Sequence, residues 1–186
     1  MRNILLVISG PSGVGKGTLK ERLLLNEENL VESVSCTTRK PRTGEKEGVN
    51  YFFVSDREFQ SRIEENDFLE YDEHFGRFYG TPRSFVERML KDKSVILEID
   101  VVGGLNAKRL MPERTVLVMI VPPSMDELKK RLKGRGSENE EEIKNRLVRV
   151  KYEMEQESLY DYVIVNDDFE EAYNKLKEIY HTEINK

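Results

Sequence analysis

A glycine-rich segment near the N-terminus constrains the fold of this chain more than any other feature. It directly follows the apolar run Ile4 to Ile8 and leads into a helical pattern with Leu19 and Leu23 on one face. Glycines allow the backbone to wrap closely, so that successive N–H groups point at phosphate oxygens, and the start of the helix adds positive potential. This strand–loop–helix context predicts a grip on the phosphates of a nucleoside triphosphate. We expect the grip to comprise Gly10, Pro11, Ser12, Gly13, Val14, Gly15, Lys16, Gly17 and Thr18.

Lys16 is expected to contact the outer phosphates, but the position after it departs from the usual pattern. A hydroxyl that binds Mg²⁺ commonly follows the lysine, whereas here Gly17 follows it and the hydroxyl comes one residue later, at Thr18. We therefore expect Mg²⁺ to be held mainly by substrate phosphates and water, which suits its tendency to keep several waters. Thr18 is the candidate protein ligand, directly or through a water.

Short apolar, β-branched runs recur along the chain, and helical patterns lie between several of them. Strands that are covered by helices on both faces read as near-continuous apolar runs. The alternation predicts an α/β fold with three layers around a five-stranded parallel sheet. The expected strands are Ile4 to Ile8, Leu30 to Ser35, Val95 to Ile99, Val116 to Val121 and Tyr162 to Val165.

Residues 36–81 interrupt this alternation. Asn50 to Val54, Phe68 to Tyr71 and Arg77 to Tyr79 have the composition of short strands, and Gly76 marks a turn between the last two. We expect an inserted, mostly antiparallel lobe here.

A second interruption, residues 124–158, consists of two charged helical stretches split by Gly134-Arg135-Gly136, which can hinge as a lid. Thr81 precedes Pro82 and is therefore expected to cap the helix that follows the lobe. At 186 residues the chain fits one domain, 1–186. Its core is expected to comprise residues 1–35, 82–123 and 159–186.

Composition narrows the class of protein further. The formal net charge of −5 argues against a broad basic surface for nucleic acid. The single cysteine, Cys36, excludes an internal disulfide and a thiolate-built zinc site, and it fits a reducing compartment. No apolar run is as long as a membrane-spanning helix, which needs about 20 residues. We expect a cytoplasmic protein with neither nucleic acid nor membrane as a partner.

A second anion site is indicated just after the second expected strand. Arg39 and Arg42 flank Pro41, which disfavours helix before it, so both arginines are expected on an irregular loop where they can converge on one anion. Taken alone, such a pair is more often a solvated surface charge. Tyr51 and Tyr79, each in an expected strand of the lobe, can add phenolic donors.

No histidine base is evident, because neither His74 nor His181 belongs to a triad or metal-ligand pattern. That absence is tolerable when the acceptor is already an anion, such as a nucleotide phosphate. A GTP-switch protein is excluded on other grounds. The segment Val165-Asn166-Asp167-Asp168 has aspartate where a base-reading Asn-Lys-x-Asp motif requires lysine.

Motifs along nearly the whole chain resemble those of the guanylate kinase family. They are Gly10 to Thr18, Ser35 to Arg42, Gly80-Thr81, Glu98-Ile99-Asp100, Gly134-Arg135-Gly136 and Val165-Asn166-Asp167-Asp168. The resemblance implies transfer of the γ-phosphoryl group of ATP to GMP, which gives ADP and GDP, with Mg²⁺ bound alongside ATP. It also implies a phosphate-loop core, a GMP-binding lobe and a mobile lid.

The resemblance assigns roles to residues at matching positions. Arg39, Arg42, Tyr51 and Tyr79 would hold the GMP phosphate. The residues that would surround guanine are Ser35, Glu70, Thr81 and Asp100. Guanine presents N1–H and N2–H₂ as adjacent donors, so an ionised Glu70 can accept both, whereas adenine has an acceptor at N1.

The remaining roles concern ATP and the transferred group. Asn166 would lie near the adenine. Val102 stands where the family commonly has glutamine. The residues expected to act in phosphoryl transfer are Lys16, Arg39, Arg131, Arg135 and Arg146.

Two alternatives remain open. A kinase for another nucleoside monophosphate would keep the phosphate loop and the arginines but would not need an acceptor such as Glu70. A non-catalytic interaction module of guanylate-kinase-like fold would typically lack an intact phosphate loop, whereas Lys16 is present here.

Overall fold

A parallel sheet forms the centre of the molecule. The protein is described by a computed structural model that covers residues 2–74, 76–134 and 140–186, with side chains described outside 131–146. The strand order is β2-β7-β1-β8-β9, and every pairing is parallel. The expected α/β fold with a five-stranded parallel sheet is confirmed. The strands are β1 (Leu5–Ser9), β2 (Leu30–Glu32), β7 (Ser94–Glu98), β8 (Thr115–Val121) and β9 (Tyr162–Val165).

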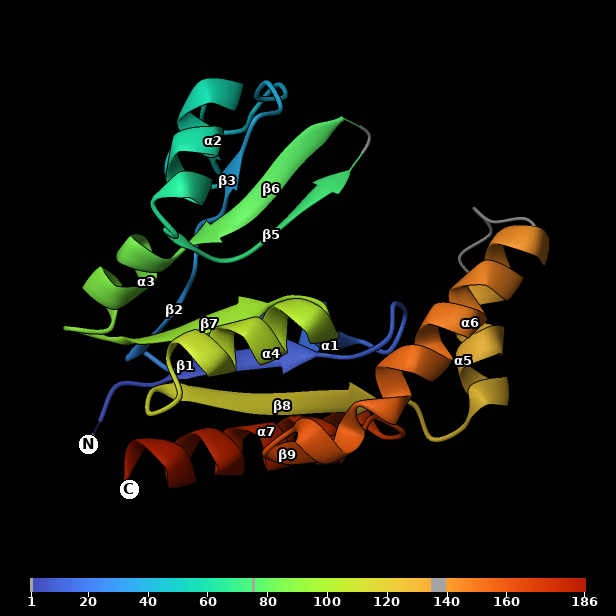
Figure 1. Ribbon diagram of the computed structural model, residues 1–186. Helices are drawn as coiled ribbons and strands as arrows, with labels where there is room; N and C mark the ends of the chain where they lie inside the picture. Colours follow the sequence, from blue (N-terminus) through green and yellow to red (C-terminus); the bar gives the residue numbers. More distant parts are fainter. Residues whose placement is uncertain (1, 75, 135–139) are drawn as a thin grey trace.

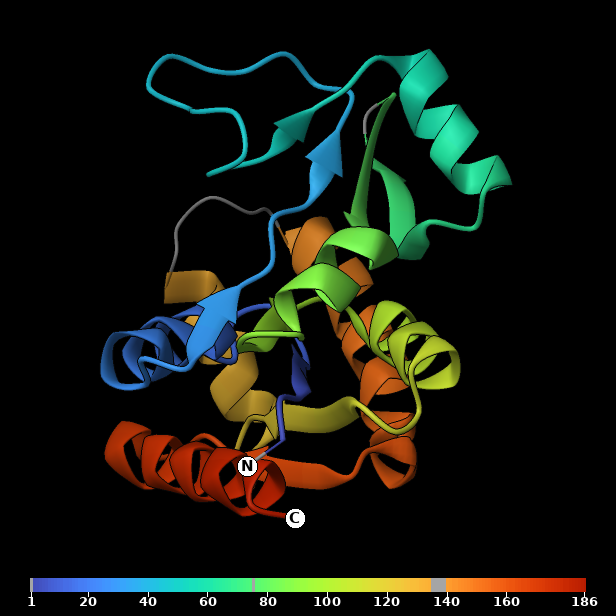
Figure 2. The ribbon, with the colours of Figure 1, turned by 90° about the vertical axis from the view of Figure 1, so that its left-hand side faces the viewer.

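Helices cover both faces of this sheet. In Figure 2, α1 (Lys16–Asn26) and α7 (Phe169–Ile184) lie on one side, whereas α4 (Val101–Leu110) lies on the other. Alternate residues of β1 enter two separate cores: Leu6 packs with the α1 and α7 side, and Val7 packs with the α4 side. Because each strand residue is covered from one face or the other, β1 and β8 are buried along their whole length.

The inserted lobe is a second, four-stranded sheet, which lies above the core sheet in Figure 1. Its order is β4-β3-β6-β5, with two antiparallel pairings and one parallel pairing. A small core of Cys36, Phe59 and Phe68 joins the sheet to α2. The elements of the lobe are β3 (Cys36–Thr37), β4 (Phe52–Phe53), α2 (Asp56–Glu64), β5 (Phe68–His74) and β6 (Arg77–Pro82).

Two expectations about this junction are wrong. The run Leu30 to Ser35 is not one strand, because β2 ends at Glu32 and the chain then crosses to β3 of the small sheet. Thr81 does not cap a helix, because it is a buried residue of β6, and α3 (Arg83–Met89) begins after Pro82. In both places, pairing with a neighbouring strand overrides a signal that is local in sequence.

A helical pair follows β8. Figure 1 shows α5 (Met125–Gly134) and α6 (Glu140–Glu155) projecting beyond the carboxyl end of the core sheet. Their mutual core contains Leu128 and Val150, and a short 3₁₀ turn, Glu157–Leu159, leads from α6 into β9. In the described ranges, no helix is both long and apolar enough to cross a membrane.

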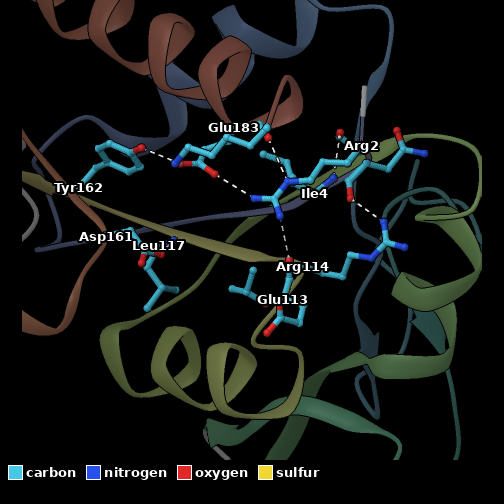
Figure 3. A network of polar contacts seen from close by, with 12 residues as sticks. Arg2, Ile4, Glu113, Arg114, Leu117, Asp161, Tyr162 and Glu183 are labelled. Atoms are coloured by element: carbon cyan, nitrogen blue, oxygen red, sulfur yellow. Dashed lines mark hydrogen bonds and ion pairs between the residues drawn. The ribbon is translucent and has the colours of Figure 1, made fainter.

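The opposite end of the sheet is closed by a polar network between the two termini (Figure 3). The guanidinium of Arg2 donates to the Glu183 carboxylate at 2.9 Å and to the carbonyl of the same residue at 3.0 Å. The Tyr162 hydroxyl donates to the other carboxylate oxygen of Glu183 at 2.6 Å. This network holds the end of α7 against the first residues of the chain, far from the carboxyl ends of the strands.

Candidate active site

The glycine-rich segment forms a loop between β1 and α1, and at Gly10 and Gly15 both the backbone angle and the surrounding space exclude a side chain. Gly10 has a φ of 137°, and a β-carbon there would lie 2.1 Å from the carbonyl oxygen of Ile120. Gly15 has a φ of 96°, and a β-carbon there would lie 2.6 Å from the amide nitrogen of Asn166. The loop is therefore pressed against β8 and against the end of β9.

Lys16 lies folded back over this loop. Its ammonium donates to the carbonyl oxygens of Gly10 at 2.6 Å and Pro11 at 3.0 Å. Gly15, the residue before α1, has no side chain and therefore provides no cap to the start of the helix. Cation and uncapped helix start together form an anion-binding arrangement.

A cavity of about 670 Å³ opens above the loop, and we call it the loop cavity. Its walls are residues 10, 12, 13 and 15–18 of the glycine-rich segment, residues 98–100 at the end of β7, and Arg149, Val150 and Glu153 of α6. Most of the segment expected to hold phosphates thus lines one cavity. Pro11 and Val14 are buried behind it.

A neighbouring cavity of about 520 Å³, the lobe cavity, lies between the small sheet and α4. Four lobe or linker residues predicted to bind the acceptor line it: Ser35, Tyr51, Glu70 and Tyr79. Asp100, Ile99 and Arg149 line both cavities, so the two are contiguous. Its other lining residues are Tyr71, Asp72, His74, Gly80, Val102, Gly103 and Asn106.

Glu70 is held in the lobe cavity by its neighbour across the β5–β6 hairpin. The two strands pair Glu70 with Thr81, and the Thr81 hydroxyl donates to the carboxylate at 2.6 Å. Gly103 of α4 leaves room for this side chain, because a β-carbon there would lie 3.1 Å from Cβ and Cγ of Glu70. Burial raises the pKa of Glu70, and the hydrogen bond from Thr81 acts in the opposite direction.

Asp100 lies at the junction of the two cavities. It is the N-cap of α4, and its Oδ1 accepts the N–H of Gly103 at 2.8 Å. Its Oδ2 accepts a hydrogen bond from Arg149 at 3.0 Å. The cap fixes the position of the carboxylate, and Arg149 holds its second oxygen at the junction of the two cavities.

Arg39 approaches the two tyrosines from the loop after β3. Its guanidinium lies 5.5 Å from the Tyr51 ring centroid and pairs with both carboxylate oxygens of Glu45, at 2.8 and 3.0 Å. Hydrogen bonding to Glu45 raises the pKa of Arg39, and the same contact lowers the pKa of Glu45. The rings of Tyr51 and Tyr79 meet edge to face at 6.0 Å, so these three predicted phosphate ligands lie together.

Other predicted residues lie at the margin of the cavities or outside the described residues. Arg42 is exposed and is fixed through its backbone N–H, which donates to Glu45 at 2.7 Å. Asn166 is buried beneath the loop, where its amide donates to the carbonyl of Val14 at 2.7 Å. Arg135 and the side chains of Arg131 and Arg146 lie outside the described residues.

Two residues of α6 were missed by the sequence reasoning. Glu153 is buried in the loop cavity, where burial raises its pKa, whereas Arg149 and Lys16 nearby favour its charged form. Arg149 joins Glu153 to Asp100. Their spacing of four residues on a charged helix was visible in the sequence, but it reads equally as a surface ion pair.

Comparisons with known proteins agree with this geometry. The family model described as guanylate kinase matches residues 2–183. The guanylate kinase of Clostridium perfringens (strain SM101 / Type A) is 49% identical over 179 residues, which is 96% of this chain and 82% of that protein. That of Caldanaerobacter subterraneus subsp. tengcongensis is 47% identical, covering 96% of this chain and 86% of the relative.

The chain is also similar to solved structures of kinases. The crystal structure of guanylate kinase from Anaplasma phagocytophilum has a TM-score of 0.72 at 38% identity, over 100% of this chain and 87% of that one. Shikimate kinase from Bacteroides thetaiotaomicron matches with a TM-score of 0.51 at 13% identity, covering 96% of this chain and 98% of that one, a likeness of fold alone. The family model covers nearly the whole chain, and the relatives are alike over nearly all of it. The chain therefore belongs to the guanylate kinase family.

Proposed function

We propose that this enzyme transfers the γ-phosphoryl group of ATP to GMP, giving ADP and GDP, with Mg²⁺ bound alongside ATP in the cytoplasm. The observation that carries the proposal is the contiguity of the two cavities. One is built on a phosphate loop, and the other contains a buried carboxylate held by Thr81. ATP would occupy the loop cavity and GMP the lobe cavity.

Recognition of guanine would depend on the carboxylates that line the lobe cavity. Glu70 in its ionised form offers two acceptor oxygens to N1–H and N2–H₂ of guanine, and the hydrogen bond from Thr81 favours that form. Asp100 and Ser35 complete the wall around the base. An adenine base would present an acceptor at N1 to Glu70 and would leave a buried carboxylate without its partner.

The acceptor phosphate would be held by Arg39, Arg42, Tyr51 and Tyr79. An arginine that is fixed by Glu45 and stacked over a tyrosine loses little further freedom when an anion arrives. Since the nucleophile is already an anionic phosphate oxygen, the site has no need of a base and instead positions the two phosphates.

Bringing two phosphates together requires cations nearby. Each pair of unit charges at about 4 Å repels by roughly 4 kcal/mol at an effective dielectric of 20. Lys16, Arg39 and the arginines of the helical pair, Arg131, Arg135 and Arg146, would offset this repulsion and stabilise the transferring group. Lys16, now bonded to loop carbonyls, would exchange those partners for phosphate oxygens.

The donor set near the loop suits Mg²⁺ in a supporting role. Thr18 and Glu98 bring oxygen atoms to the loop cavity. In the described part of the chain, no cluster of three or more His, Cys, Asp or Glu side chains could hold a metal by itself. Nucleotide phosphates and water would therefore provide most ligands, with Thr18 contributing directly or through water. When bound, the ion supplies charge neutralisation at the phosphates.

A direct comparison of acceptors tests the proposal. With ATP and Mg²⁺ as donor, we expect kcat/KM for GMP to exceed that for AMP or UMP by orders of magnitude. Preference for AMP would identify a different nucleoside monophosphate kinase, and no transfer to any acceptor would favour a non-catalytic module. Mg²⁺ is titrated in the same assay.

A further inference from the structure

Arg149 has a position that none of the expected roles explains. Among the described residues, it is the one cation that lines both the loop cavity and the lobe cavity. Its guanidinium is shared by two carboxylates on different elements. Nη2 lies 3.0 Å from Oδ2 of Asp100, and Nε lies 3.2 Å from Oε1 of Glu153. A helix surface pair explains the second contact but not the first, which joins residues 49 positions apart.

The chemistry of this contact resembles that expected for the substrate. A guanidinium presents planar N–H donors on adjacent nitrogens around one carbon, and the N1–H and N2–H₂ edge of guanine presents the same arrangement. Glu70 would accept N1–H and one N2–H of guanine, which leaves the second N2–H for Asp100. The Nη2–H of Arg149 is a similar donor, and Oδ2 of Asp100 accepts it at 3.0 Å. Both cannot use the same oxygen, Oδ2, at once.

We propose that Arg149 and the guanine of GMP compete for the same oxygen of Asp100. When GMP binds, guanine displaces the guanidinium of Arg149, which then binds the phosphates in the loop cavity. The proposal rests on the proposed function, because it takes GMP as the occupant of the lobe cavity. Binding of GMP would thus add the guanidinium of Arg149 to the cations that phosphoryl transfer requires.

Glu153 keeps Arg149 near the loop cavity once guanine has bound to Asp100. Glu153 is buried at 7% exposure and interacts electrostatically with Lys16. It holds the Nε side of the guanidinium on the loop-cavity side. The Arg149 side chain is 59% exposed and can swing without disrupting packing. A cation held there compensates the charge of the transferring group only after the acceptor has bound.

The test uses calorimetric GMP binding and steady-state transfer with Arg149→Gln and Arg149→Lys. The matched control is Lys151→Gln, which removes one positive charge from an exposed position of the same helix outside both cavities. Removing a competing exposed ion pair should tighten GMP binding by about two- to fivefold in Arg149→Gln. The same variant should lose about tenfold or more in kcat, since a transition-state cation is gone. Arg149→Lys should recover part of that loss.

A double variant separates competition from a structural effect. In the Asp100→Asn background, Arg149→Gln should no longer tighten GMP binding, because the contested oxygen has lost its charge. The proposal is overturned if Arg149→Gln leaves GMP affinity unchanged or weaker, or if its kcat stays within twofold of the Lys151→Gln control. Transfer to GMP by the unmodified enzyme is measured first. Its absence would refute the proposed function itself, whereas the Arg149 result bears on the coupling alone.

Discussion

The Thr81 hydroxyl, fully buried, donates to the Glu70 carboxylate at 2.6 Å across the β5–β6 hairpin, and Glu70 forms part of the lobe cavity wall. We expect Glu70→Gln to raise the KM for GMP by about a hundredfold or more, because the amide replaces one acceptor oxygen by an NH₂ donor that would face a guanine donor. Steady-state assays at varied GMP measure this. Glu73→Gln, on the exposed side of the same strand, is the matched control and should behave as the unmodified enzyme.

The raised pKa of Glu70 predicts a pH dependence of GMP use. Acidification should protonate this carboxyl at a higher pH than an ordinary glutamate, so the KM for GMP should rise at a pH where carboxylates of ordinary pKa are still ionised. The ATP KM should change less over the same range. In Glu70→Gln this dependence should disappear. An identical pH profile in both proteins would refute the assignment.

The same shift gives a stability prediction with a defined sign. A carboxyl whose pKa is raised in the folded state binds protons more readily there than when unfolded, so its ionisation costs stability as pH rises through the two values. The substrate-free Glu70→Gln enzyme should therefore be no less stable than the unmodified enzyme at neutral pH. Denaturant unfolding of both proteins provides the measurement. A large loss of stability would point to a structural rather than a binding role.

Lys16 provides the sharpest test of catalysis. Lys16→Ala should reduce kcat by about a thousandfold or more, since the loop loses the cation that contacts the outer phosphates. The hydrogen bonds from Lys16 to Gly10 and Pro11 go to loop carbonyls that cavity water can satisfy instead, so the free energy of unfolding should change by about 1 kcal/mol at most. Lys175→Ala, on the exposed face of α7, is the control for loss of a lysine. Near-normal turnover would contradict the proposed role.

Much of this architecture was predictable because its signals are local. Apolar runs identified all five core strands, although β2 is shorter than Leu30 to Ser35, and glycine spacing identified the loop. The exception at Thr81 is informative. Its position before Pro82 favours a helix cap, yet pairing with β5 gives its hydroxyl a better partner in Glu70. A cap signal cannot reveal which strand lies alongside.

The site was predictable to the extent that its residues belong to motifs. Glu70, Tyr51 and Tyr79, which the resemblance assigns to GMP binding, line one cavity, and their binding of GMP stays a prediction. Arg149 belongs to no motif, and its partner Asp100 is the N-cap of another helix, so only the folded chain brings the pair together. Asn166 was expected near adenine, and its observed bond to Val14 depends on the close approach of the loop to β9.

Gly17 offers a way to test how the metal is held. Its φ is not positive, and a β-carbon there would lie 3.6 Å from Oε2 of Glu98, an ordinary contact, so Gly17→Ser and Gly17→Ala should both fold. A serine hydroxyl would restore the usual oxygen donor after the lysine. It should lower the Mg²⁺ concentration for half-maximal activity by about two- to tenfold relative to alanine, the effect of one modest polar contact. Equal Mg²⁺ requirements in the two variants would show that no ligand position exists there.

The polar network between the two termini, formed by Arg2, Tyr162 and Glu183, should contribute to the stability of the fold and not to catalysis. Glu183 is 5% exposed and accepts from Arg2 and Tyr162, so Glu183→Ala should lower the free energy of unfolding by about 1–3 kcal/mol by leaving these donors unpaired. Burial opposes ionisation of Glu183, but hydrogen bonds from Lys186, Tyr162 and Arg2 hold its pKa below the ordinary value. Its stabilising contribution is therefore complete above the unfolded-state pKa and is lost as pH falls through the folded-state value.

Unfolding of Glu183→Ala and the unmodified enzyme should thus differ most at neutral pH and converge on acidification. Glu178→Ala, exposed on the same helix, is the matched control and should differ little from the unmodified enzyme at any pH. Because this polar network lies at the end of the sheet opposite the loop cavity, kcat and both KM values should be unchanged below the unfolding temperature. A stability difference that grows as pH falls, or a loss of kcat at full folding, would contradict this account of Glu183.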